Sequence, residues 1–307
     1  YLFHNTAERD GRFRVEISLI PWHGSSLTET VEFTVKANET LKVLPKIQPE
    51  RNGHWIATAR ISVPGTQDTS IQSVSFAKLT PAGPTPVRSK FLFGICSHPE
   101  RWSRRERELE AMAAALCGAK YLRATPGWGA IQPAPDRWNF KMLDRQQEIY
   151  SILGIEQQGF LGFNPQWAVE PELRKKSWQL WSRSFPDRDA FSRYAATMAD
   201  RYRGRIRYWE LCNEPDLARN AMTADEFSEL QKIAWKAVKS VNPAAVMMSG
   251  GFSSSAEHPG LIDKKFMETV LRKSLGSYEI HLIHNHGSFG QYVRRLEDHT
   301  FPLRKRA

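Results

Sequence analysis

The first eighty residues alternate polar and apolar positions in short runs that are separated by turn residues. Two examples are RFRVEI (residues 12–17) and VEFTV (residues 31–35). Side chains of a strand point alternately to its two faces, so such runs indicate strands with one buried and one solvated face. We therefore predict a small antiparallel β-sandwich over residues 1–80.

A different pattern begins after the segment PAGPTP (residues 81–86), whose three prolines forbid a regular strand ladder. We interpret residues 81–89 as a stiff linker. From residue 90 onward, short apolar strands alternate with longer amphipathic helices, which is typical of βα units in a parallel sheet. Six strands are expected, beginning near Phe91, Lys120, Ile155, Ile206, Val246 and Tyr278.

Several helix boundaries are marked in the sequence. Ser103 with Glu106, and Thr223 with Glu226, have the spacing of capping boxes at helix N-termini. One predicted helical face, closed by a glycine at position 204, consists of Phe191, Tyr194, Met198 and Tyr202.

The six βα units are compatible with an open doubly wound sheet or with a (β/α)8 TIM barrel. A nucleotide-binding sheet would carry a glycine-rich turn after its first strand, whereas this chain has GICSH (residues 94–98). We therefore predict an α/β protein in which residues 90–307 form about six of the eight units of a barrel.

Reactive groups of such barrels lie at the carboxyl ends of the strands. The predicted fourth strand, IRYWELC (residues 206–212), is followed by Asn213, Glu214, Pro215 and Asp216. This places an amide and a carboxyl group side by side at the mouth of the barrel.

These residues make the segment 90–307 resemble clan A of the glycoside hydrolases, most closely the family 39 type, which includes β-xylosidases and α-L-iduronidases. The resemblance implies that Glu214 is the general acid/base and that Asn213 binds the 2-hydroxyl group of the sugar. It also implies a retaining mechanism whose nucleophile, a glutamate at the end of the seventh strand, lies outside these 307 residues. We accordingly expect the chain by itself to be inactive.

Two alternatives stay open for the carboxylates. Glu214 could merely belong to a helix N-terminus, where Asn and Asp are favoured and Pro suits the first turn. Glu210 lies four residues before Glu214 on a strand whose side chains alternate, so both side chains are expected on the barrel-facing side. For Glu210 we favour a buried ion pair with Arg123 over a catalytic role.

Other residues are expected near the same mouth. Arg123 and Trp128 lie in a stretch similar to one of the clan, and Arg123 would orient the nucleophile unless it forms a buried salt bridge. His284 and His286 share a strand face and are candidates for substrate binding. A metal site is a rival, but no third ligand has matching spacing, and a core role is the remaining alternative.

Loops after the first and third strands complete the expected site. His98 and Asn164 are candidate walls of sugar subsites. The passage from residue 167 to residue 185 contains Trp178 and Trp181 and is either a lid or a loop pinned by aromatic anchors.

Composition narrows the choice of function. With 41% hydrophobic and 25% charged residues the chain is globular. The net charge of +10 favours anionic partners, yet the charges are scattered, so we expect no nucleic-acid-binding face. No stretch is apolar enough to span a bilayer. We interpret Cys96, Cys117 and Cys212 as buried thiols, and we expect no metal or cofactor.

Together these observations favour a glycosidase that acts on a polysaccharide or oligosaccharide. We expect a secreted or periplasmic protein, although no signal peptide is visible from Tyr1 onward. The alternative is a non-catalytic carbohydrate-binding or scaffolding barrel. The sequence indicates neither the sugar nor the oligomeric state.

Overall fold

The computed structural model describes residues 2–80, 93–217, 222–253, 265–284, 288–297 and 301–302. The chain divides into two compact units, Tyr1–Thr85 and Pro86–Ala307. The predicted linker at 81–89 lies outside the described residues.

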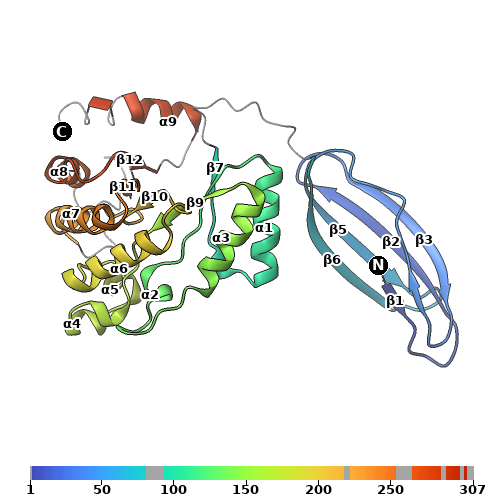
Figure 1. Cartoon of the computed structure of the whole chain (residues 1–307). Helices are drawn as coiled ribbons and strands as arrows, with labels where there is room; N and C mark the ends of the chain where they lie inside the picture. The colour runs from blue at the N-terminus through green and yellow to red at the C-terminus, as the bar shows by residue number, and fades with distance from the viewer. Residues whose placement is uncertain are drawn as a thin grey trace. The chain divides into compact units, whose positions relative to one another are not determined.

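The first unit consists of antiparallel strands (Figure 1). A four-stranded sheet has the order β3-β2-β5-β6, and a second sheet pairs β1 with β4. The strands are β1 (Leu2–His4), β2 (Gly11–Pro21), β3 (Leu27–Val35), β4 (Thr40–Lys42), β5 (Gly53–Ser62) and β6 (Thr69–Lys78).

The core of this unit is small. Val15, Ile17 and Ala59 are buried on one face of the large sheet, and Phe3 from β1 packs against them. The expected antiparallel, one-face-buried strands are therefore present, and the second layer described for the sandwich is only two strands wide.

The second unit contains a six-stranded parallel sheet in the order β12-β11-β10-β9-β8-β7. Its strands are β7 (Gly94–Cys96), β8 (Tyr121–Arg123), β9 (Glu156–Phe160), β10 (Tyr208–Glu210), β11 (Val246–Phe252) and β12 (Ile280–Ile283). Each strand lies next to its neighbours in sequence, as successive βα units require. The sheet is consistent with part of a (β/α)8 barrel, and it contains the six strands that the sequence predicts.

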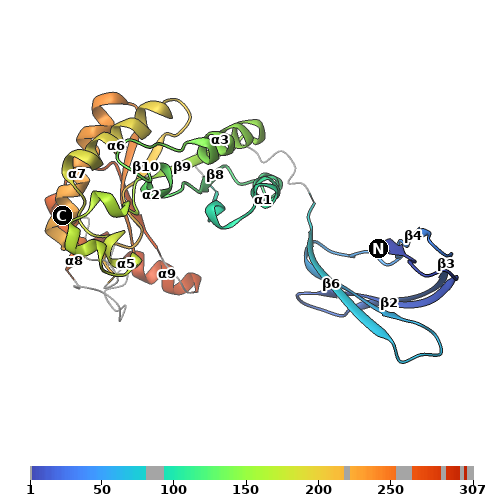
Figure 2. The same ribbon diagram turned by 90° about the horizontal axis from the view of Figure 1, so that it is seen from below.

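Helices follow each of these strands (Figure 2). They are α1 (Arg104–Leu116), α2 (Trp128–Ile131), α3 (Lys141–Leu153), α4 (Pro171–Arg174), α5 (Trp178–Trp181), α6 (Arg188–Arg201), α7 (Ala224–Val241), α8 (Phe266–Lys273) and α9 (Phe289–Arg295), with 3-10 turns at Pro99–Arg101 and Gln166–Ala168. Both predicted capping boxes are present, before α1 and before α7.

The main core fills the space between this sheet and its helices. The predicted face of α6 is buried in it, together with Trp209 from β10 and Phe227 from α7. After α6 the chain turns at Gly204, whose φ of 75° is in the left-handed region that glycine adopts without strain.

The cysteines differ from the prediction. All three are free, but Cys96 and Cys117 are exposed and only Cys212 is buried. Cys96 is the last residue of β7, an edge strand of the described sheet. Cys117 is the C-cap residue of α1. The apolar residues next to Cys96 and Cys117 in the sequence therefore did not indicate that these two thiols are buried. Within the described ranges no helix has both the length and the apolar character to cross a membrane.

Candidate active site

Glu214 lies at the carboxyl end of the parallel sheet, where the backbone pairing continues beyond β10. Its backbone N–H donates to the carbonyl oxygen of Gly251 at 2.8 Å, and the N–H of Gly251 donates to the carbonyl of Cys212 at 2.9 Å. Glu214 has a φ of 46°, a left-handed conformation that a residue with a side chain adopts at a free-energy cost of roughly 1–3 kcal/mol. The neighbouring strand thus fixes a strained backbone at the residue that the sequence singles out.

Both oxygens of the Glu214 carboxylate have polar neighbours. Oε1 lies 3.2 Å from Nδ1 of His284, and Oε2 accepts a hydrogen bond from Nδ2 of Asn213 at 3.4 Å. His284 follows β12, and its backbone N–H donates to the backbone carbonyl of Phe252 at 2.6 Å. The Glu214 side chain is 13% exposed, so the carboxyl group is mostly shielded but is still reached by solvent.

A second cluster lies beside the first, formed by Arg123 at the end of β8 and Glu210 at the end of β10. Arg123 donates to both carboxylate oxygens of Glu210, at 2.6 and 2.7 Å, and Gln158 donates to the same carboxylate at 2.7 Å. Glu210 is fully buried, whereas the Arg123 side chain is 21% exposed. The buried salt bridge that the sequence left as an alternative for Arg123 is therefore present.

Arg123 also determines how Asn213 is oriented. Its Nη2 donates to Oδ1 of Asn213 at 2.9 Å, which leaves the amide N–H₂ facing Glu214. Burial opposes the charge of Arg123, but the hydrogen bond and the charge of Glu210 outweigh it and hold the pKa of Arg123 above its ordinary value. The guanidinium therefore remains charged and fixes the amide.

Gly251 allows these groups to approach one another. A Cβ atom at this position would lie 2.4 Å from Nε2 of His284 and 3.0 Å from Oε1 of Glu210. Real Cβ atoms do not tolerate the shorter distance, so any side chain here would displace His284. The glycine thus brings the His284 ring close to Glu210 as well as to Glu214.

Two further titratable groups flank Glu214. Burial, followed by the charge of Glu214, raises the pKa of Asp216, while hydrogen bonds from Ser253 oppose this shift. Burial raises the pKa of the Cys212 thiol to about 12. Cys212 is therefore protonated at neutral pH and is no nucleophile.

The remaining predicted residues are not part of this cluster. Trp128 is 0% exposed and its ring stacks on Tyr194 with centroids 4.8 Å apart, so the expectation that it contacts substrate is corrected to a core role. Asn164 is buried and donates to the carbonyl of Ser184 at 2.6 Å, which holds the following loop. His98 is exposed and lies 3.4 Å from Glu100. His286 lies outside the described residues.

The passage from residue 167 to residue 185 contains α4 and α5. Trp178 is half-exposed, and the guanidinium of Arg183 lies over the rings of Phe163 and Trp178, at 5.1 and 5.9 Å from their centroids. These contacts tie the passage to the loop that follows β9. They fit the interpretation of aromatic anchors that pin a loop.

Sequence reasoning missed Cys96 and Gln158. The Cys96 thiol lies 3.4 Å from Nη1 of Arg123, and Gln158 binds Glu210. A cysteine and a glutamine belong to no local motif, and only their position on β7 and β9, Cys96 at the carboxyl end and Gln158 in the middle of its strand, could have indicated them. Among the described residues no group of three or more possible ligands could hold a metal ion.

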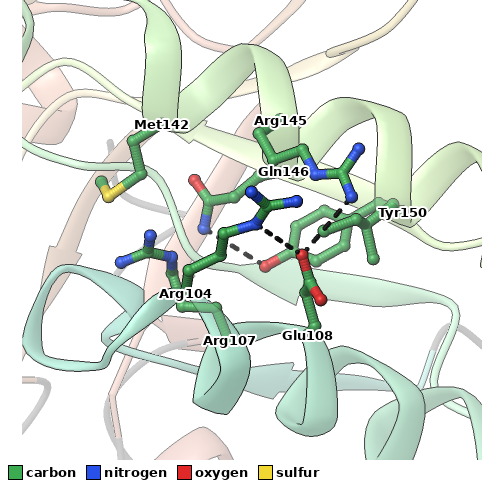
Figure 3. Close-up of a pocket in the computed structure, with 8 residues that line it drawn as sticks. Arg104, Arg107, Glu108, Met142, Arg145, Gln146 and Tyr150 are labelled. Atoms are coloured by element: carbon green, nitrogen blue, oxygen red, sulfur yellow. Dashed lines mark hydrogen bonds and ion pairs between the residues drawn. The ribbon is translucent and has the colours of Figure 1, made fainter.

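A separate hollow lies between α1 and α3 (Figure 3). Arg104 and Arg145 both donate to Glu108 there, at 3.1 and 3.4 Å. Arg107, Met142, Gln146, Ile149 and Tyr150 complete its lining. It contains none of the predicted site residues.

The parallel sheet and the polar residues at its carboxyl end define a barrel-type α/β fold with a candidate active site built around carboxylates. No family model and no curated protein sequence matches the chain. Solved structures do match.

A family 39 glycoside hydrolase from the gut symbiont Bacteroides cellulosilyticus WH2 superposes with a TM-score of 0.60 at 17% identity, over 92% of this chain and 53% of that chain. Xylanase 10B from Thermotoga maritima gives a TM-score of 0.47 at 16% identity, over 68% and 66% of the two chains. Bacteroides uniformis β-glucuronidase 2 gives 0.47 at 15% identity, over 98% and 36%.

The first of these likenesses shows that the chain shares the fold of that family 39 glycoside hydrolase structure. The present chain spans about half the length of that family 39 structure.

Proposed function

We propose that this chain is part of a retaining glycosidase in which Glu214 is the general acid/base. The observation that carries the proposal is the position of Glu214 at the carboxyl end of β10, partly buried and bracketed by Asn213 and His284. A general acid needs a fixed, partly desolvated carboxyl group whose proton can reach a departing oxygen. If Glu214 only belonged to a helix N-terminus, its side chain would not need Asn213 and His284 at its two carboxylate oxygens.

The neighbouring residues have supporting roles in this proposal. Asn213, held through its Oδ1 by Arg123, presents its amide N–H₂ both to Glu214 and to a sugar hydroxyl. His284 orients the Glu214 carboxyl group through Nδ1. Glu214 would protonate the glycosidic oxygen in the first step and remove a proton from water in the second.

A retaining mechanism also needs a nucleophilic carboxylate about 5–5.5 Å from the acid. Glu210 is a poor candidate because both of its oxygens are bound by Arg123 and one also by Gln158. Asp216 is also a poor candidate, because its carboxylate accepts hydrogen bonds from the backbone N–H and the hydroxyl group of Ser253. We propose that the nucleophile is the glutamate implied for the seventh strand and lies outside these 307 residues.

For the substrate we propose a polysaccharide or oligosaccharide. The net charge of +10 favours an acidic glycan over a neutral one, because a positive protein concentrates anions near its surface.

The test is a panel of nitrophenyl glycosides offered to the 307-residue protein and to a polypeptide that also carries the two further βα units. We expect turnover only from the longer polypeptide, and loss of that turnover in Glu214→Gln. Turnover by the 307-residue protein that disappears in Glu214→Gln would show that the nucleophile is within it. Glycan binding without turnover by either form would favour the non-catalytic barrel.

A further inference from the structure

Trp22, which directly follows β2 in the first unit, is unusually exposed for a tryptophan. Its side chain and backbone together are 74% exposed, although indole rings are usually well buried. The ring is nevertheless held in place. The indole ring lies edge-on to the rings of His23 and His54, with its centroid 6.3 and 5.9 Å from theirs. The backbone N–H of Trp22 donates to the carbonyl of His54 at 3.1 Å.

The register of the large sheet shows which face carries Trp22. Pro21 is opposite Trp55, so Trp22 is next to His54, and His54 is opposite Ala77. Trp55 and the alternate residues of β5 point into the core, which places Trp22 and His54 on the opposite, solvent-facing side.

Two more rows continue this solvent-facing side. The next row pairs Ile20 with Ile56 and Ile56 with Ser75, and the row after it pairs Ser18 with Thr58 and Thr58 with Ser73. Hydrogen bonds between hydroxyl groups connect Thr58 to Ser73 at 3.1 Å and Ser18 to Thr28 at 3.4 Å. We call the following residues the Trp22 face: Trp22, His54, Ala77, Ile20, Ile56, Ser75, Ser18, Thr58 and Ser73.

The chemistry of the Trp22 face suits a sugar chain better than a protein. A pyranose ring has an apolar C–H face that packs on an aromatic ring, and hydroxyl groups around its edge that need hydrogen-bond partners. The face supplies one open indole ring, an imidazole and a row of hydroxyl groups. A stable protein interface buries about 800 Å² per partner around a cluster of apolar anchors. Among the residues of the Trp22 face, only Trp22 and Ile20 are exposed large apolar residues, and Ile71 on the same side of the sheet lies beyond the Ser–Thr row, so there are too few for such a cluster.

We propose that the Trp22 face is a polysaccharide-binding site, in which Trp22 stacks on one sugar ring while His54 and the Ser–Thr row bind hydroxyl groups of the same chain. The indole ring is already held by His23 and His54, so binding orders few new torsions. The site would keep the protein on a glycan independently of any reaction at Glu214.

The test is affinity electrophoresis of the 307-residue protein through gels that contain neutral or acidic polysaccharides, followed by titration with the best ligand. We expect wild type to be retarded by at least one polysaccharide and Trp22→Ala to bind it about tenfold or more weakly, because the stacked ring is lost. Trp22→Tyr, which keeps an aromatic face, should retain most of the affinity.

The matched control is Trp102→Ala, which removes an exposed tryptophan from the second unit. It should bind like wild type, and unchanged circular dichroism should show that each variant is folded. No retardation of wild type, equal binding by Trp22→Ala, or an equal loss in Trp102→Ala would each overturn the proposal. An inactive barrel would leave it standing, because the readout is binding and not hydrolysis.

Discussion

Glu210 is the residue on which the geometry of the candidate site depends most. It is fully buried, and its carboxylate is the partner of Arg123 and Gln158. Through Arg123 it also determines which way the Asn213 amide faces. A buried carboxylate of this kind stabilises the folded state only while its partners are in place.

We predict that Glu210→Gln lowers the free energy of unfolding of the second unit by about 3 kcal/mol, because it leaves the Arg123 charge without its carboxylate. Denaturation in urea measures the change. The control is Glu32→Gln, which breaks an ion pair with Arg12 on the protein surface, where the loss should be below about 1 kcal/mol. Equal losses in the two variants would contradict a structural role for the Arg123–Glu210 pair.

Asp216 gives a prediction about pH. Its pKa is raised above the ordinary aspartate value of 3.8, mainly by burial, so the folded state holds this proton more tightly than the unfolded state does. The contribution of Asp216 to stability should therefore fall as pH rises from about 3.8. We expect the difference in unfolding free energy between wild type and Asp216→Asn to decline over that range. A flat or rising difference would show that the hydrogen bonds from Ser253 outweigh burial.

The sequence predicted some of these contacts and not others, for a physical reason. Glu210 and Arg123 could be paired in advance because both lie near the carboxyl ends of parallel strands and carry opposite charges. Gln158 and Cys96 lie in no motif, so nothing in the chain assigned them a partner. Trp128 was misplaced because an aromatic residue after a strand fits a core or a mouth equally well.

Helix boundaries are the best-predicted elements, because their signals are local. The capping boxes before α1 and α7 involve residues only three positions apart, and both form as the spacing indicates. Strand positions in the parallel sheet also follow from a local signal, the short apolar runs between the amphipathic helices. The pairing of β1 with β4 was not predicted, because contact between segments about 36 residues apart has no local signal.

We predict that Thr223→Ala destabilises the second unit by about 1 kcal/mol, because it removes the oxygen that accepts from the N–H of Glu226 at the start of α7. The matched control is Thr197→Ala within α6, whose hydroxyl bonds only the carbonyl of Arg193 in its own helix. That change should be close to neutral, since alanine is the better helix former. Thermal unfolding of both variants is the measurement, and equal shifts would mean that the capping box contributes nothing specific.

The parallel sheet is open at both sides among the described residues, since β7 pairs only with β8 and β12 only with β11. Next to β7, α1 exposes three apolar side chains that share one helical face, namely Leu109, Met112 and Leu116. Apolar surface beside an unpaired strand edge favours association.

We predict that the 307-residue protein associates as its concentration rises and binds an apolar dye, and that Met112→Lys reduces both effects without lowering the unfolding temperature. Light scattering and dye fluorescence are the measurements. Ile152→Lys is the control, because Ile152 is highly exposed but belongs to α3 and not to the apolar face of α1. If Ile152→Lys has the same effect as Met112→Lys, the α1 face is not the associating surface.

The proposed role of Glu214 is tested most directly by comparing the hydrolysis of two kinds of glycoside. The enzyme is the longer polypeptide that also carries the two further βα units and, with them, the proposed nucleophile. Glu214→Ala should slow the hydrolysis of glycosides with poor leaving groups by about 10²–10⁴-fold, because their departure needs a proton. Activated aryl glycosides, which need little protonation, should be slowed far less at the step that releases the leaving group, and azide should restore their turnover. An equal loss on both kinds of substrate without azide rescue, or a loss below about tenfold, would contradict an acid/base role for Glu214.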